Sequence, residues 1–174
     1  MQWPVEKAVI IPAIRNGFLI RPFQSGDEYG LLQLRHLAGE CLDCSEEDVG
    51  RTALDQVVNG GLFLAIKQDT GQIVGSAIAK DNASSYPFHG GSLHAVFVDP
   101  AFRGFHLGAG LAATVTHHLV EAAYTDIFLT TDDHRLPALK TYLGLGWSPI
   151  VFDKEHEERW RSVFSKLGME ATKL

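Results

Sequence analysis

The sequence has few cysteines, and it has no long uncharged apolar run. Its two cysteines, Cys41 and Cys44, form a lone C-x-x-C with no second pair of cysteines or histidines at ligand spacing nearby. A zinc site needs such a second pair, and a redox motif would open a βαβ helix, whereas this pair ends a helical stretch. We therefore expect two ordinary thiols and no metal site. Because no apolar run is long enough to cross a bilayer, we also expect no membrane span.

Basic residues are scarce too. Fifteen Lys and Arg residues stand against 21 Asp and Glu residues, which gives a net charge of −6. That balance argues against a nonspecific nucleic-acid or membrane-surface binder, so we expect neither nucleic acid nor a membrane as a partner. The N-terminal stretch "MQWPVEKAVIIPAI" carries charges and Pro12 and has no clear cleavage pattern, so we interpret it as part of the mature protein. These features predict a soluble cytoplasmic protein.

The length of 174 residues and the 45% of hydrophobic residues predict a single domain over residues 1–174, with 1–16 as an N-terminal extension. Hydrophobic periodicity and turn residues predict the elements. The predicted strands cover 17–23, two strands of a hairpin within 60–80, 92–98, 126–131 and a last strand in "WSPIVF" (147–152). The predicted helices cover 27–40, 45–59, 108–123, 137–147 and 153–168. This order predicts an α/β fold of the α+β type, with a mixed twisted sheet and helices on both faces.

The segment "VDPAFRGFHLGAGL", residues 98–111, joins a predicted strand to a predicted helix. It places Arg103, Gly104 and Gly108 where the helix should begin. The first turn of a helix has unpaired N–H groups and the positive end of the helix dipole, and glycines let a ligand approach the backbone closely. Arg103 adds a cation suited to phosphate oxygens, and the alternative is a solvated turn residue. The segment predicts a phosphate or pyrophosphate site, with the spacing of neither a P-loop nor a dinucleotide fingerprint.

Together with the preceding strand, this segment resembles the signature of a known family. "VFVDPAFRGFHLGAGL" (96–111) is similar to the pattern of the GCN5-related N-acetyltransferases (GNAT), in which a strand ending in V-x-P is followed by R/Q-x-x-G-x-G/A and the apolar face of a helix. "RLPALKTYLGLGW" (135–147) resembles the later family segment N-x-x-A-x-x-L-Y-x-x-x-G-F. "LIRPFQSGD" (19–27) is similar to the usual first strand and helix start, so the resemblance covers nearly the whole chain.

The resemblance implies the GNAT fold, acetyl-CoA as co-substrate and an amine as acceptor. Carried over position by position, it implies that backbone groups of Val96, Phe97 and Val98 hold the pantetheine arm and the thioester carbonyl. The residues that it implies around the pyrophosphate are Arg103, Gly104, Phe105, His106, Leu107 and Gly108. Tyr142 matches the family tyrosine that often protonates the departing thiolate, and the alternative is a core tyrosine on the inner face of a helix.

Two positions depart from the family pattern. His106 stands where the first glycine of the motif is usual, and its N–H can still serve if φ is negative, so we expect cofactor binding to survive. Arg135 replaces the asparagine of the later segment, and an arginine can reach a phosphate instead. His94 lies on the strand that should carry the thioester, where the family often places a base or a residue that holds a relay water. A bulge at this point would scramble the alternation of faces, so a catalytic His94 and a His94 buried against a helix are both open.

These residues predict an N-acetyltransferase that transfers the acetyl group of acetyl-CoA to a primary amine of a small molecule or peptide, by direct attack in a ternary complex. The alternatives are another acyl donor, such as succinyl-CoA, and a CoA-binding module without turnover. A covalent cysteine route would need Cys41 or Cys44 beside the thioester, and nothing places them there. We expect the acceptor to contact 27–59, 81–91 and the region after Trp147, and the protein to be a monomer or homodimer. The negative net charge favours a cationic amine.

Overall fold

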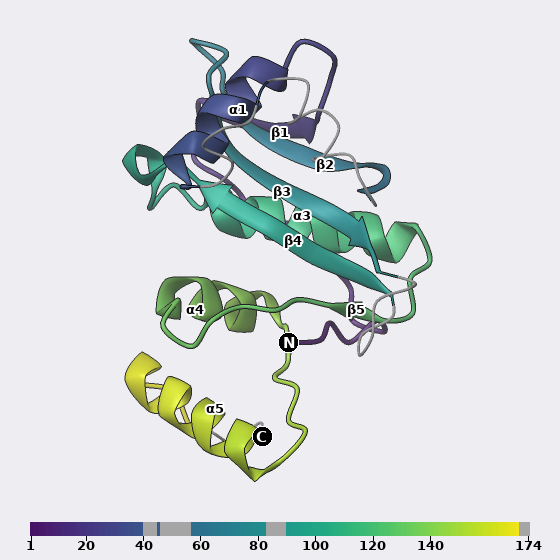
Figure 1. Cartoon of the computed structure of the whole chain (residues 1–174), viewed down its shortest axis with the longest axis vertical. Coiled ribbons are helices and arrows are strands. Elements are labelled where there is room, and N and C mark those ends of the chain that lie inside the picture. The colour runs from purple at the N-terminus through teal and green to yellow at the C-terminus, as the bar shows by residue number, and fades with distance from the viewer. Residues whose placement is uncertain (40–44, 46–56, 83–89, 171–174) are drawn as a thin grey trace.

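A five-stranded sheet forms the centre of the computed structural model, which describes residues 1–39, 45, 57–82 and 90–170 (Figure 1). The strands are β1 (Phe18–Pro22), β2 (Val57–Lys67), β3 (Ile73–Asp81), β4 (Gly91–Val98) and β5 (Ile127–Phe128). The helices are α1 (Glu28–Leu37), the short 3₁₀ helix η1 (Pro100–Phe102), α3 (Leu107–Glu121), α4 (Leu136–Leu145) and α5 (Lys154–Leu167). The mixed sheet and its flanking helices confirm the predicted fold class. None of the helices in the described ranges is long and apolar enough to span a membrane.

The strands lie in the order β1-β2-β3-β4-β5, with the first four antiparallel to their neighbours and β5 parallel to β4. β2 and β3 form the hairpin that we predicted within 60–80. Its turn includes Gly71 at φ 71°, a left-handed conformation that glycine adopts at little cost. Parallel strands cannot be joined by a tight turn, and α3 provides the crossover between β4 and β5.

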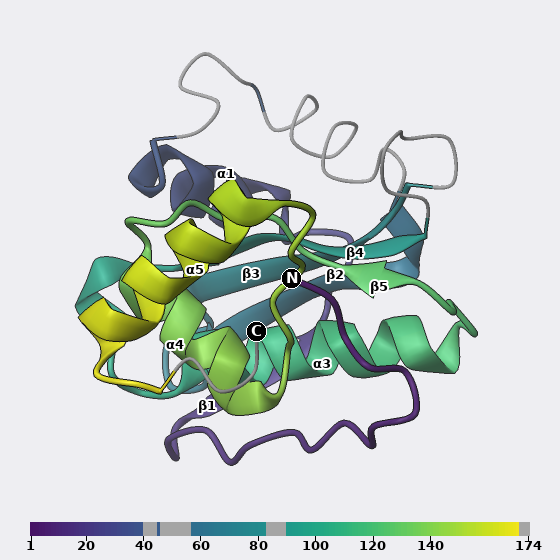
Figure 2. The same ribbon diagram turned by 90° about the horizontal axis from the view of Figure 1, so that it is seen from below.

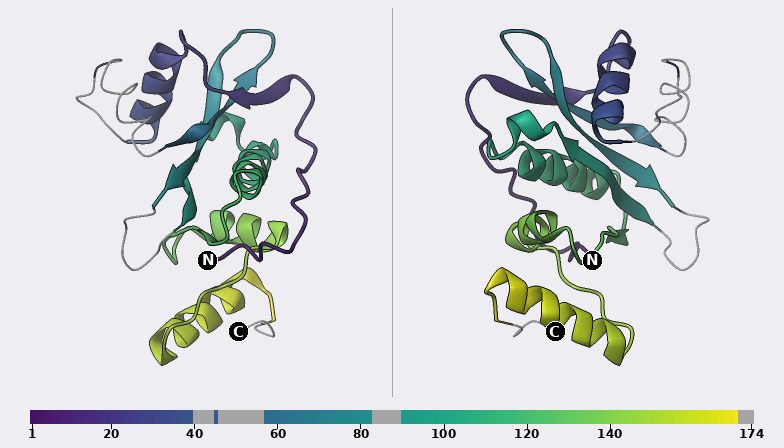
Figure 3. Two further views of the ribbon diagram at one scale, coloured as in Figure 1. Left: turned by 90° about the vertical axis from the view of Figure 1, so that its right-hand side faces the viewer. Right: turned by 60° about the vertical axis from the view of Figure 1, so that its left-hand side comes forward.

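Helices cover the two faces of the sheet with separate apolar clusters. On one face, Leu31 and Leu34 of α1 pack with Leu64, Ile73 and Ile78 of the strands. On the other face, α3 is the main cover, and its buried residues include Leu107, Leu111, Val115 and Leu119, the stripe that the helical period predicts. Figure 3 shows α1 and α3 on opposite sides of the strands. We call the first side the α1 face and the second the α3 face.

The N-terminal residues extend the sheet beyond β5. Gln2 forms bridges with Phe128 on one side and Ser148 on the other. The Trp3 N–H donates to the Ile127 carbonyl oxygen at 2.8 Å. The Trp3 ring packs edge-on to Trp147, with 5.7 Å between ring centroids, and both rings are 2% exposed. Residues 1–3 are therefore part of the core structure.

This arrangement explains two strand predictions that differ from the structure. The strand predicted over 126–131 contains only the two residues of β5, because the chain then leaves β4. The predicted last strand in "WSPIVF" is reduced to a bridge at Ser148, whose partner is Gln2. Pro149 has no N–H to continue that pairing. The edge of β5 is thus paired by the beginning of the chain.

Two further predictions concern residues 40–59. Most of the helix predicted over 45–59 lies outside the described residues, as do Cys41 and Cys44. The end of that prediction was wrong, because residues 57–59 belong to β2, where Val57 pairs with Lys80. The β-branched pair Val57–Val58 suits a strand, and the tertiary pairing outweighs the helical pattern before it.

Candidate functional site

Strand β4 is longer than its parallel neighbour, and this difference opens one edge of the sheet. β5 pairs with β4 only at Gly91 and Ser92, whereas β4 continues to Val98. Figure 1 shows the chain after β5 moving away from β4 toward α4. Backbone N–H and C=O groups on this edge of β4 between residues 93 and 98 therefore have no strand partner in β5. Such groups need other hydrogen-bond partners, and a bound ligand can provide them.

A β-bulge lies in the middle of this open stretch. Ala95 has φ 48°, and the pairing of β3 with β4 shifts register between Ile78–His94 and Ser76–Phe97. Ala95 and Phe97 pack against the cluster on the α1 face, whereas Val96 packs on the α3 face. Residues directly opposite in an antiparallel pair share a face, so His94 lies with Ile78 on the α1 face. His94 is exposed there, and the interpretation of a histidine buried against a covering helix is wrong.

The turn after β4 has a specific local cause. Asp99 is 8% exposed, and its side chain accepts a hydrogen bond from the Ala101 N–H at 2.9 Å, which caps η1. Pro100 follows at the first position of η1, where its fixed φ suits a helical start. The chain therefore leaves the sheet in a defined direction, and the exposed residues Arg103 and Gly104 come directly after η1.

Residues 103–108, which we call the anion loop, join η1 to α3 through two left-handed residues. Gly104 has φ 82° and His106 has φ 61° and ψ 13°. The condition of a negative φ, under which we expected the His106 N–H to serve the cofactor, is therefore not met. This left-handed conformation favours glycine, but histidine is among the residue types that tolerate it. The first turn of α3 follows directly, with N–H groups that have no partners within the helix.

Gly108 and Gly110, in the first turn of α3, differ in whether packing requires a glycine. A Cβ atom on Gly110 would lie 2.6 Å from Ile14 Cγ2 and 2.8 Å from Ile20 Cδ1, so Gly110 is needed for close packing. A Cβ atom on Gly108 would make only an ordinary contact, at 3.7 Å from Val98 Cγ2. Packing of the protein therefore does not require glycine at 108. The missing side chain leaves room for a ligand over the helix N-terminus.

Tyr142 lies on α4 and is 8% exposed. Its ring centroid is 6.5 Å from that of Trp147, and it shares the apolar cluster of the α3 face with Val96 and Val98. Burial raises the pKa of the Tyr142 hydroxyl to about 12, against a smaller lowering by the charge of Arg135. The hydroxyl therefore keeps its proton at neutral pH, as a proton donor must.

Arg135 is at the N-terminal boundary of α4 and is well exposed. Its Nε atom lies 3.0 Å from Asp132 Oδ2, in an ion pair with 63% and 58% of the two side chains exposed. An exposed pair of this kind is weak, so the guanidinium can exchange Asp132 for another anion at little cost. The neighbouring Asp133 binds Arg159 of α5 through two hydrogen bonds of 2.8 and 3.0 Å, which attach this turn to α5.

The structure thus arranges the predicted residues in three groups. Val96, Val98 and Tyr142 share the α3-face cluster, His94 lies on the α1 face of the same strand, and the anion loop follows the end of that strand. Arg135 stands apart in its ion pair. The sequence patterns did not select Arg15, whose N–H donates to the Phe105 carbonyl oxygen at 3.2 Å. No motif covers that part of the chain, so no pattern could have selected it.

Comparison with known sequences decides the family. The sequence model of the acetyltransferase (GNAT) family matches residues 31–147, which is more than half of the chain. The chain belongs to the GNAT acetyltransferase family. The match includes β4, the anion loop, α3 and α4, so the GNAT motifs coincide with the groups described above.

Individual relatives share about a third or less of their aligned residues with this chain. A mycothiol acetyltransferase of Nocardia farcinica is 28% identical over 168 residues, which cover 87% of this chain and 54% of that protein. Another, of Mycolicibacterium gilvum, is 34% identical over 98 residues, which cover 53% of this chain and 31% of that protein. The GNAT chain therefore spans about half or less of the length of these curated relatives.

Solved structures support the fold. Glucosamine-6-phosphate N-acetyltransferase of Arabidopsis thaliana superposes with a TM-score of 0.62 at 19% identity, covering 78% of this chain and 95% of that chain. An aminoglycoside N-acetyltransferase in complex with CoA superposes with a TM-score of 0.60 at 15% identity, covering 83% and 97%. At these identities the likeness shows the shared fold.

Proposed function

We propose that this GNAT chain is an N-acetyltransferase that transfers the acetyl group of acetyl-CoA to a primary amine by direct attack in a ternary complex. The observation that carries this proposal is the open edge of β4, which leads directly into the anion loop and the N-terminus of α3. An extended thioester arm fits an unpaired strand edge, and a pyrophosphate fits a helix N-terminus. The two features lie next to each other in the order in which CoA carries these groups.

This placement supports the cofactor residues that the family resemblance implied. Backbone groups of Val96, Phe97 and Val98 hold the pantetheine arm and the thioester carbonyl oxygen. The anion loop surrounds the pyrophosphate with the Arg103 guanidinium and the N–H groups of Gly104, Phe105, Leu107 and Gly108, while His106, at positive φ, forms part of the loop without its N–H as a ligand. Gly108 supports this role because protein packing at this position does not require glycine. Arg135 is a further cation that can contact a phosphate if it leaves Asp132.

The reaction requires one proton to leave the amine and one to reach the departing thiolate. His94 accepts the proton of the amine, directly or through one water, as the nitrogen forms its bond to the carbonyl carbon. An N–H near Phe97 or Val98 stabilises the developing oxyanion. As the C–S bond breaks, the Tyr142 hydroxyl donates its proton to the CoA sulfur. His94 and Tyr142 suit these roles because one lies on the α1 face and the other in the cluster of the α3 face.

For the acceptor we propose a chemical class and no single compound. The α1 face carries His94, and large parts of two segments expected to contact the acceptor, 27–59 and 81–91, lie outside the described residues. We infer a small-molecule or peptide amine, with a cationic amine favoured by the net charge of −6. The likeness to mycothiol acetyltransferases makes the acceptor of those enzymes the first compound to test.

Two measurements test the proposed function. A titration with CoA tests binding, and release of the free thiol from acetyl-CoA or succinyl-CoA with a panel of amines tests turnover. We expect saturable CoA binding and amine-dependent thiol release that is faster with acetyl-CoA. Faster release from succinyl-CoA would identify another acyl donor, and CoA binding without release would identify a module without turnover. Failure to bind CoA would refute the whole proposal.

A further inference from the structure

The N-terminal segment before β1 reaches the anion loop from outside the region that the GNAT family model matches. Figures 2 and 3 show residues 4–16 running along the side of α3 that faces away from the sheet. Ile14 contacts the helix at Gly110, where a Cβ atom would collide with it at 2.6 Å. Arg15 then meets the loop, with its N–H bonded to the Phe105 carbonyl oxygen at 3.2 Å. The family match begins at residue 31, so residues 14 and 15 lie outside the matched region.

The side chain of Arg15 reinforces the backbone contact. Its guanidinium carbon lies 4.4 Å from the centroid of the Phe105 ring, in cation–π geometry. The Phe18 ring of β1 supports the loop from below, at 5.5 Å from Phe105 and 5.9 Å from Phe102. The Phe105 ring of the loop is thus in contact with both Arg15 and Phe18, and the Phe102 ring of η1 is in contact with Phe18. A stacked guanidinium presents its N–H groups at its edge, where they can still donate.

Two positively charged side chains, Arg15 and Arg103, lie at or beside the anion loop. Among the ion pairs between described residues, none includes Arg15 or Arg103. Both side chains are exposed. CoA is a polyanion, and this protein has a net charge of −6, so binding needs local cations to overcome the general repulsion. An exposed arginine that has no ion-pair partner among the described residues, and that is fixed by stacking beside the anion loop, provides such a cation.

We propose that Arg15 provides the second cation of the CoA phosphate site, held against Phe105 so that its guanidinium faces a phosphate bound at the anion loop. This inference rests on the proposed function, because it assumes that the loop binds CoA. The phosphate is either the pyrophosphate or the 3′-phosphate of CoA, which share the same recognition chemistry. Arg15 acts in binding and is remote from the proposed acetyl transfer at β4. It should therefore affect cofactor affinity and leave turnover at saturation unchanged.

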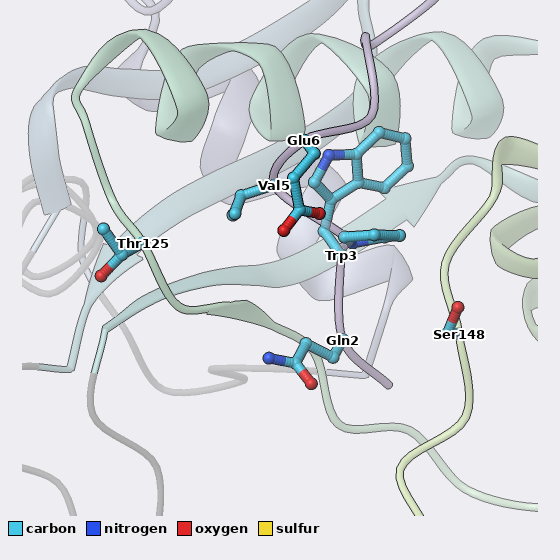
Figure 4. Close-up of a pocket in the computed structure, with 7 residues that line it drawn as sticks. Gln2, Trp3, Val5, Glu6, Thr125 and Ser148 are labelled. Atoms are coloured by element: carbon cyan, nitrogen blue, oxygen red, sulfur yellow. The ribbon is translucent and has the colours of Figure 1, made fainter.

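One pocket of the described structure lies away from the proposed cofactor site. A pocket of about 320 Å³ is lined by Gln2, Trp3, Pro4, Val5, Glu6, Thr125 and Ser148 (Figure 4). None of these residues belongs to β4 or to the anion loop, and nothing in the described structure indicates a ligand for it. Arg15, in contrast, contacts the anion loop through its backbone N–H and through its guanidinium, which stacks on the Phe105 ring.

The test compares charge-neutral variants at three arginines. Titration calorimetry with CoA should give a dissociation constant about tenfold higher for Arg15→Gln, the usual size for loss of one contact to a charged group. The affinity should also depend less steeply on salt. Arg103→Gln should show at least the same loss. Arg161→Gln is the matched control, because this arginine on α5 is paired with Glu157 and should leave affinity unchanged.

Further arms separate charge from packing and identify the phosphate. Arg15→Lys keeps the charge and should retain most of the CoA affinity. A loss of affinity as large as that of Arg15→Gln would contradict a role of the positive charge at this position. Dephospho-CoA lacks only the 3′-phosphate, so equal losses with both cofactors assign the pyrophosphate, and a loss with CoA alone assigns the 3′-phosphate. Unchanged CoA affinity of a stably folded Arg15→Gln protein would refute the inference. If the wild-type protein does not bind CoA, the proposed function has failed instead.

Discussion

At the scale of single residues, β4 places two consecutive side chains on the same face. Regular alternation would turn His94 and Ala95 to opposite faces, but the bulge at Ala95 keeps both on the α1 face. The same bulge leaves Val96 with the cluster that contains Tyr142. The bulge thus decides which faces Val96, Phe97 and Val98 present, whereas His94 precedes it on the α1 face and Tyr142 lies on α4 on the other side of the sheet. Positive φ at an alanine costs free energy, and sites of function are where such strain is commonly found.

His94 can be tested as a base by pH dependence. The activity of the wild type should fall on the acid side as the His94 imidazole takes up a proton and can no longer act as a base, and His94→Gln should remove that limb. Because His94 is exposed, the melting temperature should be nearly unchanged. The measurements are the pH–rate profile and thermal unfolding of the same variant. An unaltered acid limb in an active variant would exclude His94 and turn attention to Glu40 and Asp43, which lie outside the described residues.

Tyr142 can be tested as an acid by removal of its hydroxyl. Tyr142→Phe should lower the turnover number about a hundredfold, the lower range for loss of a positioned proton donor, with little change in CoA affinity. The ring keeps its packing against Trp147, so the fold should survive. Since burial raises the pKa of Tyr142 to about 12, its ionisation should not reduce the wild-type rate between pH 7 and 10. Full activity of the variant would show that Tyr142 is only a core residue.

At the scale of elements, α3 combines two glycines with opposite requirements. Gly110→Ala places a Cβ atom within 2.8 Å of both Ile14 and Ile20, and we expect a loss of about 1–3 kcal/mol in the free energy of unfolding. Gly108→Ala meets only Val98, at 3.7 Å, and should keep or slightly raise stability. CoA affinity should show the reverse order once each variant is folded, with the larger loss for Gly108→Ala.

Denaturant unfolding and CoA titration of the two variants check this prediction. A destabilised Gly108→Ala protein would show that packing explains both glycines. A Gly108→Ala protein with wild-type CoA affinity would indicate that the phosphate does not pass over this position. Gly144→Ala on α4 is a suitable reference, because a Cβ atom there would meet no atom within 4 Å.

The sequence predicted most elements because their signals are local. The stripe of α3, the hairpin of β2 and β3 and the turn at Pro100 each depend on residues close in the chain. The failures depend on partners far away. The only partner of the predicted last strand is Gln2 at the other end of the chain, which pairs at Ser148 alone, and the φ of His106 depends on how the loop enters α3. The motifs located the loop, but the Arg15 contact required the three-dimensional path of residues 4–16.

At the scale of the whole molecule, the N-terminal segment connects regions that are far apart in the sequence. Its first residues pair with β5 and Ser148, and its end contacts α3 and the anion loop. Figure 2 shows this segment passing from the N-terminus, beside β5, along α3 to β1. The sheet edge beside β4 and the proposed phosphate site are therefore both supported by residues 1–16, which we had interpreted as an extension.

Trp3 tests whether this segment stabilises the whole fold. Its ring is 2% exposed against Trp147, so Trp3→Ala should lower the free energy of unfolding by about 3–5 kcal/mol, the range for a fully buried large aromatic ring. Trp3→Phe should cost less, about 1–2 kcal/mol, because the buried Trp3 indole N–H has no hydrogen-bond partner among the described residues and its removal loses no bond. Ile10→Ala, at a side chain 79% exposed in the same segment, should change stability by less than about 0.5 kcal/mol. Chemical denaturation of the three variants gives these values. If Trp3→Ala is as stable as Ile10→Ala, residues 1–3 do not hold the edge of β5 in solution.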